Sequence, residues 1–293
     1  MLTTGTFDGV HLGHREIINR LRDIADRVGG ETVLMTFYPH PRLVLFPDDP
    51  NIQLLQTIEE KKASLKEAGI DHLILLPFTQ EFAKLSALEY VRDVLVQTIG
   101  VHTVVVGYDH RFGKNREGDF SSLEEFSEMF GFHVEEIPAR LIDDLSISST
   151  KIRNALLAGA VDQANSYLGY NYLLSGCVIH GDGLGHKLGF PTANLRINDS
   201  HKLIPGPGVY AVHVKIKGSN YNGMMNIGVR PTVSSSDEKR LEVHLFDFSD
   251  DLYGAEMEVR FAGRIRNEMK FNSVDELKAQ LLVDKQHAVE MTL

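Results

Sequence analysis

Apolar positions in the first half of the chain follow two alternating patterns. Apolar residues three or four apart between 17 and 28, ended by Gly29 and Gly30, predict a first helix. Apolar runs at 32–37, 72–76 and 101–106 predict buried strands, and helical patterns at 57–68 and 85–99 lie between them. Strands that alternate with helices and are apolar on both faces predict a parallel sheet with helices on each side.

The period of the pattern changes from 3.6 to 2 after about residue 167. Tyr210, Val212, Val214 and Ile216 alternate with polar residues, and 241–248 and 257–261 also read as strands, with Gly, Pro and Asp turns between them. Short strands in succession predict a small antiparallel barrel. A helix at 273–283 is expected to follow, capped by Ser273 with Glu276 completing a capping box.

The change of period divides the chain into an α/β domain at 1–157, a linker helix at 158–172 and a β domain at 173–293. A length of 293 residues is enough for two domains that each bury a core.

The amino-acid composition limits which partners and which cellular location are expected for this protein. The formal net charge is -10, so nonspecific binding to nucleic acid or to an anionic membrane is not expected. Polyanionic substrates would need local cations or Mg²⁺. A single cysteine, Cys177, no apolar stretch of about 18 residues and no visible signal peptide predict a cytoplasmic protein. The oligomeric state, a homo-oligomer included, is left open.

The stretch from Thr4 to His14 joins the first strand to the first helix through a glycine-rich turn. Glycines let the backbone approach an anion, and a helix N-terminus presents unpaired N–H groups. His11 and His14 would face the same anion. Taken alone, the two histidines also fit surface residues or half of a metal site.

A second polar cluster, Ser148, Ser149, Thr150 and Arg153, stands at the start of another apolar helical pattern. A Ser/Thr run at this place is typical of a helix N-cap. Its hydroxyl groups, its backbone N–H groups and Arg153 would also suit a triphosphate.

Both clusters resemble the two signatures of the nucleotidyltransferase superfamily, and the first resembles the adenylyltransferase module of the prokaryotic bifunctional riboflavin kinase/FAD synthetase family. The resemblance implies a Rossmann-like nucleotidyltransferase domain in which His11, His14 and Arg153 are catalytic. It also implies ATP contacts at Gly5, Phe7, Asp8, Gly13, Ser148, Ser149 and Thr150. The family pattern leads us to expect a few more residues before the first strand, which begins almost at Met1.

The loop from Gly107 to Asp119 mixes glycines, aromatic residues and cations. Alone it fits a charged surface loop, but after a buried strand it also suits a lid over an aromatic ring and phosphates. It resembles a flavin-site motif of the same family, with His110 in place of the usual Phe. The resemblance implies flavin contacts at Asp109, Arg111 and Phe112.

A glycine-rich stretch in the barrel half leads into Pro191-Thr192-Ala193-Asn194. The glycines fit a mobile hairpin tip or a wrap around ATP phosphates, and Thr192 and Asn194 point the same way toward one Mg²⁺. The stretch resembles the flavokinase motif, with a cation, His186 or Lys187, where the family often has Arg. The implied ATP contacts are Gly181, Gly183, Gly185, Lys187, Gly189, Thr192 and Asn194, with Thr192 and Asn194 also on the metal.

Further matches follow in the expected order. Glu242, His244 and Phe246 share one face of a strand; a lone Glu in a strand is usually solvated, but the resemblance makes Glu242 the general base. It also implies flavin contacts at Asn226, Arg230 and Phe246.

The resemblance covers the whole chain and implies a riboflavin kinase with a six-stranded barrel and terminal helix, joined to an FMN adenylyltransferase. The implied substrates are riboflavin, FMN and ATP, with Mg²⁺. Two alternatives remain: adenylylation of another phosphorylated metabolite by the first half, and a flavin- or nucleic-acid-binding barrel without catalysis. The attached kinase motif and the acidic chain disfavour them.

Overall fold

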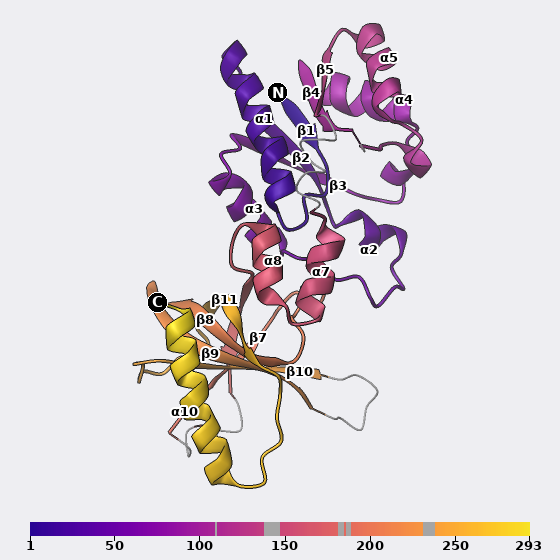
Figure 1. Cartoon of the computed structure of the whole chain (residues 1–293). Helices are drawn as coiled ribbons and strands as arrows, with labels where there is room; N and C mark the ends of the chain where they lie inside the picture. The colour runs from indigo at the N-terminus through magenta and orange to yellow at the C-terminus, as the bar shows by residue number, and fades with distance from the viewer. Residues whose placement is uncertain (109, 138–146, 181–184, 186–188, 231–237) are drawn as a thin grey trace. The chain divides into compact units, whose positions relative to one another are not determined.

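The computed structural model describes every residue except 109, 138–146, 181–184, 186–188 and 231–237, and at 229, 230 and 238 it describes the backbone. The chain divides into two compact units, Met1–Ser149 and Thr150–Leu293 (Figure 1). Each unit has its own sheet and its own buried core.

The first unit is built on a parallel sheet, as predicted. Its strands are β1 (Leu2–Thr4), β2 (Val33–Tyr38), β3 (His72–Pro77), β4 (Thr103–Gly107) and β5 (His133–Ile137). The strand order is β3-β2-β1-β4-β5, with every neighbouring pair parallel. The order reverses between β1 and β4, and ligands of such sheets bind at the carboxyl ends of the strands at this point. The opening turn follows β1, and the loop from Gly107 follows β4.

Helices cover both faces of this sheet. They are α1 (Leu12–Val28), α2 (Pro41–Leu45), α3 (Ile58–Glu67), α4 (Ala87–Glu89) and α5 (Phe120–Phe130), with the short turns η1 (Phe82–Lys84) and η3 (Lys114–Arg116) and the π-helix η2 (Tyr90–Ile99). Leu34 packs with α1 and α3 on one face. The next residue, Met35, packs with η2 and α5 on the other face, which gives three layers.

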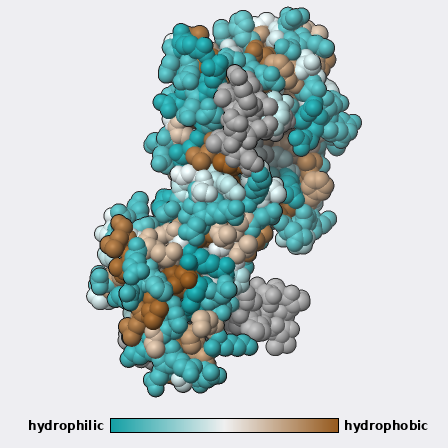
Figure 2. Space-filling view, viewed as in Figure 1, coloured by the Kyte–Doolittle hydropathy of each residue, from teal (hydrophilic) through white to brown (hydrophobic). Residues whose placement is uncertain are grey.

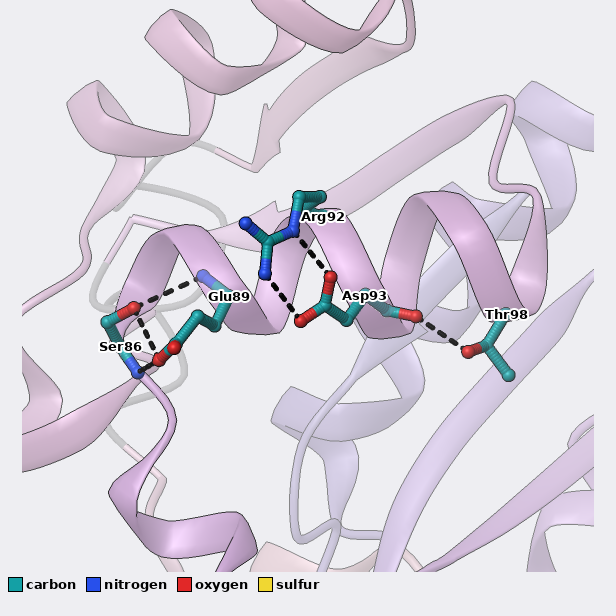
Figure 3. A network of polar contacts seen from close by, with 5 residues as sticks. All are labelled: Ser86, Glu89, Arg92, Asp93 and Thr98. Carbon is teal, nitrogen blue, oxygen red and sulfur yellow. Dashed lines mark hydrogen bonds and ion pairs between the residues drawn. The ribbon is translucent and has the colours of Figure 1, made fainter.

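The helix predicted at 85–99 is a composite of α4 and η2, and this corrects the prediction of one regular helix. Ser86 and Glu89 form a reciprocal capping box at its start (Figure 3). Farther along, Arg92 pairs with Asp93, and the Thr98 hydroxyl donates to the Asp93 carbonyl over 2.6 Å, five residues back. The wider turn of a π-helix brings residues five apart into register.

The second unit contains a closed antiparallel barrel, as predicted. Its strands are β6 (Leu173–Ile179), β7 (Ala193–Arg196), β8 (Gly208–Ile216), β9 (Ser219–Arg230), β10 (Glu238–Leu245) and β11 (Glu256–Arg266). They close in the order β10-β7-β6-β11-β8-β9. Tyr210 and Phe261 meet edge to face in the interior, and alternate residues of β6 and β11 are buried there.

The terminal helix α10 (Val274–Met291) is longer than predicted and contacts β8, β9 and β11. Ser273 caps it, but the Glu276 carboxylate accepts the N–H of Asn272, so the predicted capping box is only half formed. Apolar residues on α10, Leu282 and Val283 among them, remain exposed, and Figure 2 shows apolar side chains gathered in this region.

Two helices, α7 (Ser149–Leu157) and α8 (Val161–Leu168), precede the barrel and pack on it. The Gly206 N–H donates to the Leu156 carbonyl over 2.8 Å, and the Asn165 amide donates to the Phe261 carbonyl over 2.8 Å. The compact units therefore divide at Ser149, earlier than the predicted boundary after 157, because these contacts fasten both helices to the barrel.

Candidate active sites

The turn after β1 has an unusual backbone that its buried side chains hold in place. Phe7 and Val10 have φ values of 44° and 37°, in the left-handed region that residues with side chains rarely adopt, and Gly9 has a φ of 94°. The Phe7 and Val10 side chains are buried against Ile18 and Leu34, so core packing offsets the strain. The turn therefore keeps a fixed curved backbone at the predicted anion site.

His11 and His14 come together at the first turn of α1. The His14 N–H donates to Nδ1 of His11 over 3.3 Å, so His11 caps the helix. Because Nδ1 is the acceptor, a neutral His11 carries its proton on Nε2. The two rings stack with centroids 3.6 Å apart. A side chain at Gly13 would begin 3.3 Å from the His11 ring, so glycine leaves room for that ring.

Burial lowers the pKa of His14 well below its usual value, and the neighbouring His11 and Lys61 lower it further. His14 is therefore neutral at pH 7 in the free protein and is suited to hydrogen bonding rather than to fixed positive charge. Its Nδ1 is buried and has no hydrogen-bond partner among the residues that the structure describes. A bound ligand would be a natural partner for this nitrogen.

The Asp8 carboxylate fastens the turn to the segment before α3. It accepts the N–H of Leu55 at 3.0 and 3.1 Å and the N–H of Gln56 at 3.3 Å. Asp8 is 2% exposed. The structure thus shows that the Asp8 side chain positions the turn, and its contact with ATP stays a prediction.

Lys61 reaches the same turn from α3 and was not among the predicted site residues. Its Nζ donates to the Thr6 carbonyl over 2.7 Å, and the Thr36 hydroxyl donates to the same carbonyl over 3.2 Å. The signal in the sequence was its spacing, because Lys61 precedes the buried Leu65 by one helical turn and so lies on the face that packs.

The second signature contributes Ser149 to the opening turn. Its hydroxyl donates to the Asp8 carbonyl over 3.0 Å, although the two residues are far apart in the sequence. Helix α7 begins at Ser149, and Thr150 and Arg153 lie beyond it in the second compact unit.

The loop after β4 is packed against the fold rather than open as a lid. Phe112 and Gly118 exchange two backbone hydrogen bonds of 3.1 and 2.9 Å, and the Lys114 N–H donates to the Leu85 carbonyl over 2.7 Å. The Phe112 ring is 7% exposed and belongs to the core, and its predicted flavin contact stays a prediction. Arg111 pairs with Asp119 at 2.7 Å, and Asp109 lies outside the described residues.

In the barrel, strand register brings three predicted site residues into one row. Glu242 on β10 lies opposite Asn194 on β7 and opposite Asn226 on β9. Leu241 and Val243, on either side of Glu242, are buried in the barrel interior. Because side chains alternate along a strand, the row Asn194–Glu242–Asn226 lies on the outer face of the barrel.

A cavity of about 350 Å³ lies over this row and under α10. Its polar lining includes Thr192, Asn194, Asn226, Arg240 and Glu242, and its apolar lining includes Phe190, Met224, Phe271, Leu277 and Leu281. A cavity in which apolar walls meet convergent polar groups is typical of a small-molecule site. Gly185 also lines it, and a side chain there would begin 2.4 Å from the Phe190 carbonyl oxygen.

Arg240 joins two members of the row. Its Nε lies 3.3 Å from a carboxylate oxygen of Glu242 and 3.3 Å from the Asn194 side-chain oxygen. Arg240 was not predicted as a site residue, although its position two residues before Glu242 on the same strand face was a signal.

His244 holds the segment that carries Thr192. Its Nδ1 lies 2.8 Å from the Pro191 carbonyl, which can only accept, so Nδ1 carries the proton. Burial lowers the pKa of His244, the hydrogen bond to Pro191 raises it and the charge of Lys285 lowers it, with burial the largest effect.

The remaining predicted residues fall into two groups. Phe246 is buried with Phe190, Met224 and Ala288 beneath α10 and does not line the cavity. Phe246, Gly5, Ser148 and Gly189 thus lie within the described residues, whereas the second group lies outside the described residues or side chains: Gly181, Gly183, His186, Lys187 and Arg230. No group of three or more His, Cys, Asp or Glu within the described ranges is placed to hold a metal. None of the helices that the structure describes is both long and apolar enough to span a membrane.

The geometry thus presents two separate candidate sites: a strained turn at the start of a helix in the α/β unit, and a barrel with a carboxylate at a cavity. Residues 1–151 match the family described as FAD synthetase, and residues 168–292 match the family described as riboflavin kinase.

Curated relatives named bifunctional riboflavin kinase/FMN adenylyltransferase match nearly the whole chain. The protein from Listeria monocytogenes is 38% identical over 98% of this chain and 90% of its own length. The protein from Haemophilus influenzae is 40% identical over 98% of this chain and 92% of its own length.

A solved structure from Streptococcus pneumoniae, titled as a macrolide-efflux protein, superimposes with a TM-score of 0.88 at 34% identity and covers 97% of this chain and 92% of that one. The chain belongs to the bifunctional riboflavin kinase/FMN adenylyltransferase family, with the adenylyltransferase domain first and the kinase domain second.

Proposed function

We propose that the chain phosphorylates riboflavin in the cavity of the barrel and adenylylates the product, FMN, at the turn after β1, with ATP as the second substrate of both reactions. The row Asn194–Glu242–Asn226 over the cavity carries the kinase assignment, because it places a carboxylate between two amides at a small-molecule site. The functional domains are assigned to 1–157 and 173–293, joined by 158–172.

In the kinase reaction, Glu242 is assigned as the general base. Its carboxylate takes the proton of the ribityl 5′-hydroxyl while that oxygen bonds to the γ-phosphorus of ATP and ADP leaves. The apolar wall of Phe190, Phe271 and Leu281 suits the flavin ring, and Asn226 offers a polar contact beside it.

The residues around Glu242 fit a magnesium ion. The Thr192 hydroxyl and the Asn194 amide oxygen are oxygen ligands, which Mg²⁺ prefers together with substrate phosphates. When bound, the ion would neutralise phosphate charge. Nε of Arg240 lies 3.3 Å from the Asn194 oxygen, so the Arg240 side chain would share this oxygen with the ion or move aside.

In the adenylyltransferase reaction no base is required. The attacking group is the FMN phosphate, which is largely ionised at pH 7 because its second pKa is about 6. Its oxygen bonds to the α-phosphorus of ATP, and pyrophosphate leaves. Nε2–H of His11, the imidazole of His14 and the helix N-terminus offer hydrogen bonds to the phosphates, and Arg153 is assigned to the same role.

The partners proposed are small molecules, and a reducing, cytoplasmic location agrees with the single cysteine. The wild-type chain, incubated with riboflavin, ATP and Mg²⁺, should form FMN and FAD, which chromatography resolves. Glu242→Gln should abolish FMN formation but keep FAD synthesis from added FMN, and His14→Ala should do the reverse. Loss of both activities in either folded variant would contradict the two-site assignment.

A further inference from the structure

We propose that Lys61 is a catalytic residue of the adenylyltransferase site, which binds the polyphosphate of ATP and the departing pyrophosphate. This inference rests on the proposed function of the turn after β1. It adds a cation to a site in which the two histidines supply hydrogen bonds.

Lys61 is buried where a lysine is normally exposed. It is 6% exposed, whereas the next residue, Lys62, has a side chain that is 42% exposed and pairs with Glu59 at 2.8 Å. The Nζ of Lys61 instead lies 2.7 Å from the Thr6 carbonyl, in the turn whose next residue, Phe7, is held in the left-handed region.

The ammonium group of Lys61 has more N–H donors than its hydrogen bond to Thr6 uses. An ammonium group offers three N–H donors, and the Thr6 carbonyl takes one. Within the described part of the chain, no carboxylate lies at ion-pair distance from Lys61. Asp8 raises the pKa of Lys61 through its charge, but its carboxylate accepts the N–H groups of Leu55 and Gln56.

A buried cation without an anionic partner is costly, and the missing partner is what a phosphate would supply. Burial lowers the pKa of Lys61, although the charge of Asp8 raises it, which agrees with an unsatisfied cation. When the bond between the α-phosphorus and the leaving oxygen breaks, negative charge grows on the pyrophosphate. A cation already fixed beside the turn would stabilise that charge without rearrangement.

A purely structural role is the rival explanation, since the hydrogen bond to Thr6 also supports the turn. Lys61→Gln separates the two roles, because glutamine can donate to the Thr6 carbonyl but carries no charge. Lys61→Met removes both the donor and the charge, Lys61→Arg keeps both, and Lys62→Met is the matched control on the exposed face.

The experiment uses the full-length chain and measures FAD synthesis from FMN and ATP, and FAD cleavage by added pyrophosphate. Lys61→Gln and Lys61→Met should each lower kcat/KM for ATP by about a hundredfold and raise the KM for pyrophosphate, as loss of one transition-state donor does. Lys61→Arg should recover most of this loss, and Lys62→Met should stay within about twofold of wild type. FMN formation from riboflavin should be unchanged in all four variants.

Near-wild-type kinetics of Lys61→Gln would overturn the proposal, because the hydrogen bond alone would then suffice. So would an equal loss of affinity for adenosine and for a non-hydrolysable ATP analogue, since this would indicate collapse of the turn. Absence of FAD synthesis in the wild-type chain would instead overturn the proposed function.

Discussion

Replacement of Asp284 with alanine tests whether one buried ion pair holds the wall of the kinase cavity. Asp284 lies on α10 and is 0% exposed. Its carboxylate accepts Nε of Arg266 at 2.8 Å, Nη2 of Arg266 at 2.7 Å and the Gln280 amide at 2.9 Å. Since Arg266 ends β11, this pair fastens α10 to the barrel.

The expected loss of stability depends on Arg266, which keeps its charge when Asp284 is replaced. Removal of one partner of a buried ion pair costs about 3–5 kcal/mol, because the other charge stays buried without a partner. The Arg266 side chain is 16% exposed and also donates to the Asn267 carbonyl, so solvent reaches it. We therefore expect the free energy of unfolding of the second unit to fall by about 3 kcal/mol, the lower end of that range. Riboflavin affinity should fall as well, because Asp284 lines the cavity.

Calorimetry of the full-length chain measures this loss, with FAD synthesis from FMN as an activity that should persist. Glu290→Ala, which removes an exposed carboxylate of the same helix, is the control and should change stability by less than about 0.5 kcal/mol. A loss below about 1 kcal/mol in Asp284→Ala would refute the reasoning. The double variant Arg266→Met/Asp284→Leu should recover part of the lost stability. If its loss of stability equalled the sum of the losses in Arg266→Met and Asp284→Leu, the two side chains would not act as a pair.

Two further predictions concern the first unit. Asp8→Ala should lower the free energy of unfolding of this unit by about 2–4 kcal/mol, because the Leu55 and Gln56 N–H groups lose a charged acceptor. FMN formation should persist. A thermal transition at the wild-type temperature would contradict this prediction. Because the pKa of His14 is lower in the folded than in the unfolded chain, stability should fall as pH decreases below about 6.5, by up to about 1.4 kcal/mol per pH unit. Urea denaturation of His14→Gln between pH 7 and 5 should lack this contribution, and an unchanged pH dependence would exclude it.

The sheet and the barrel could be predicted from the sequence because each depends on a period in the apolar residues. The terminal helix shows the limit of that signal. The presence of this helix was predicted, but its Leu282 and Val283 side chains are exposed, whereas Asp284 is buried. A hydrophobic pattern assigns the charged residue to the solvent face, and only the location of Arg266 on β11 reverses that assignment.

In the candidate sites too, some residues could be predicted from their neighbours in the sequence, whereas others depend on contacts between distant parts of the chain. The turn, the two histidines and the carboxylate at Glu242 were predicted as site residues from their neighbours in the sequence. Lys61 and Arg240 were missed because charged side chains on a helix or strand usually face water. The burial of Phe112 against Tyr90 could not be predicted, because a loop aromatic gives no sign of its packing partners, and its flavin contact stays a prediction.

Register is what turns the separate motifs of the barrel into one site. Glu242 meets Asn194 and Asn226 only in the observed pairing of β7, β10 and β9. A shift of one residue would turn Glu242 into the apolar interior, because strand side chains alternate in direction. Gly223 favours the observed pairing, since a side chain there would begin 2.5 Å from the His244 carbonyl, where β9 and β10 approach closely. Glycine at 223 thus supports the pairing that places Glu242 beside Asn194 and Asn226, although Gly223 does not line the cavity.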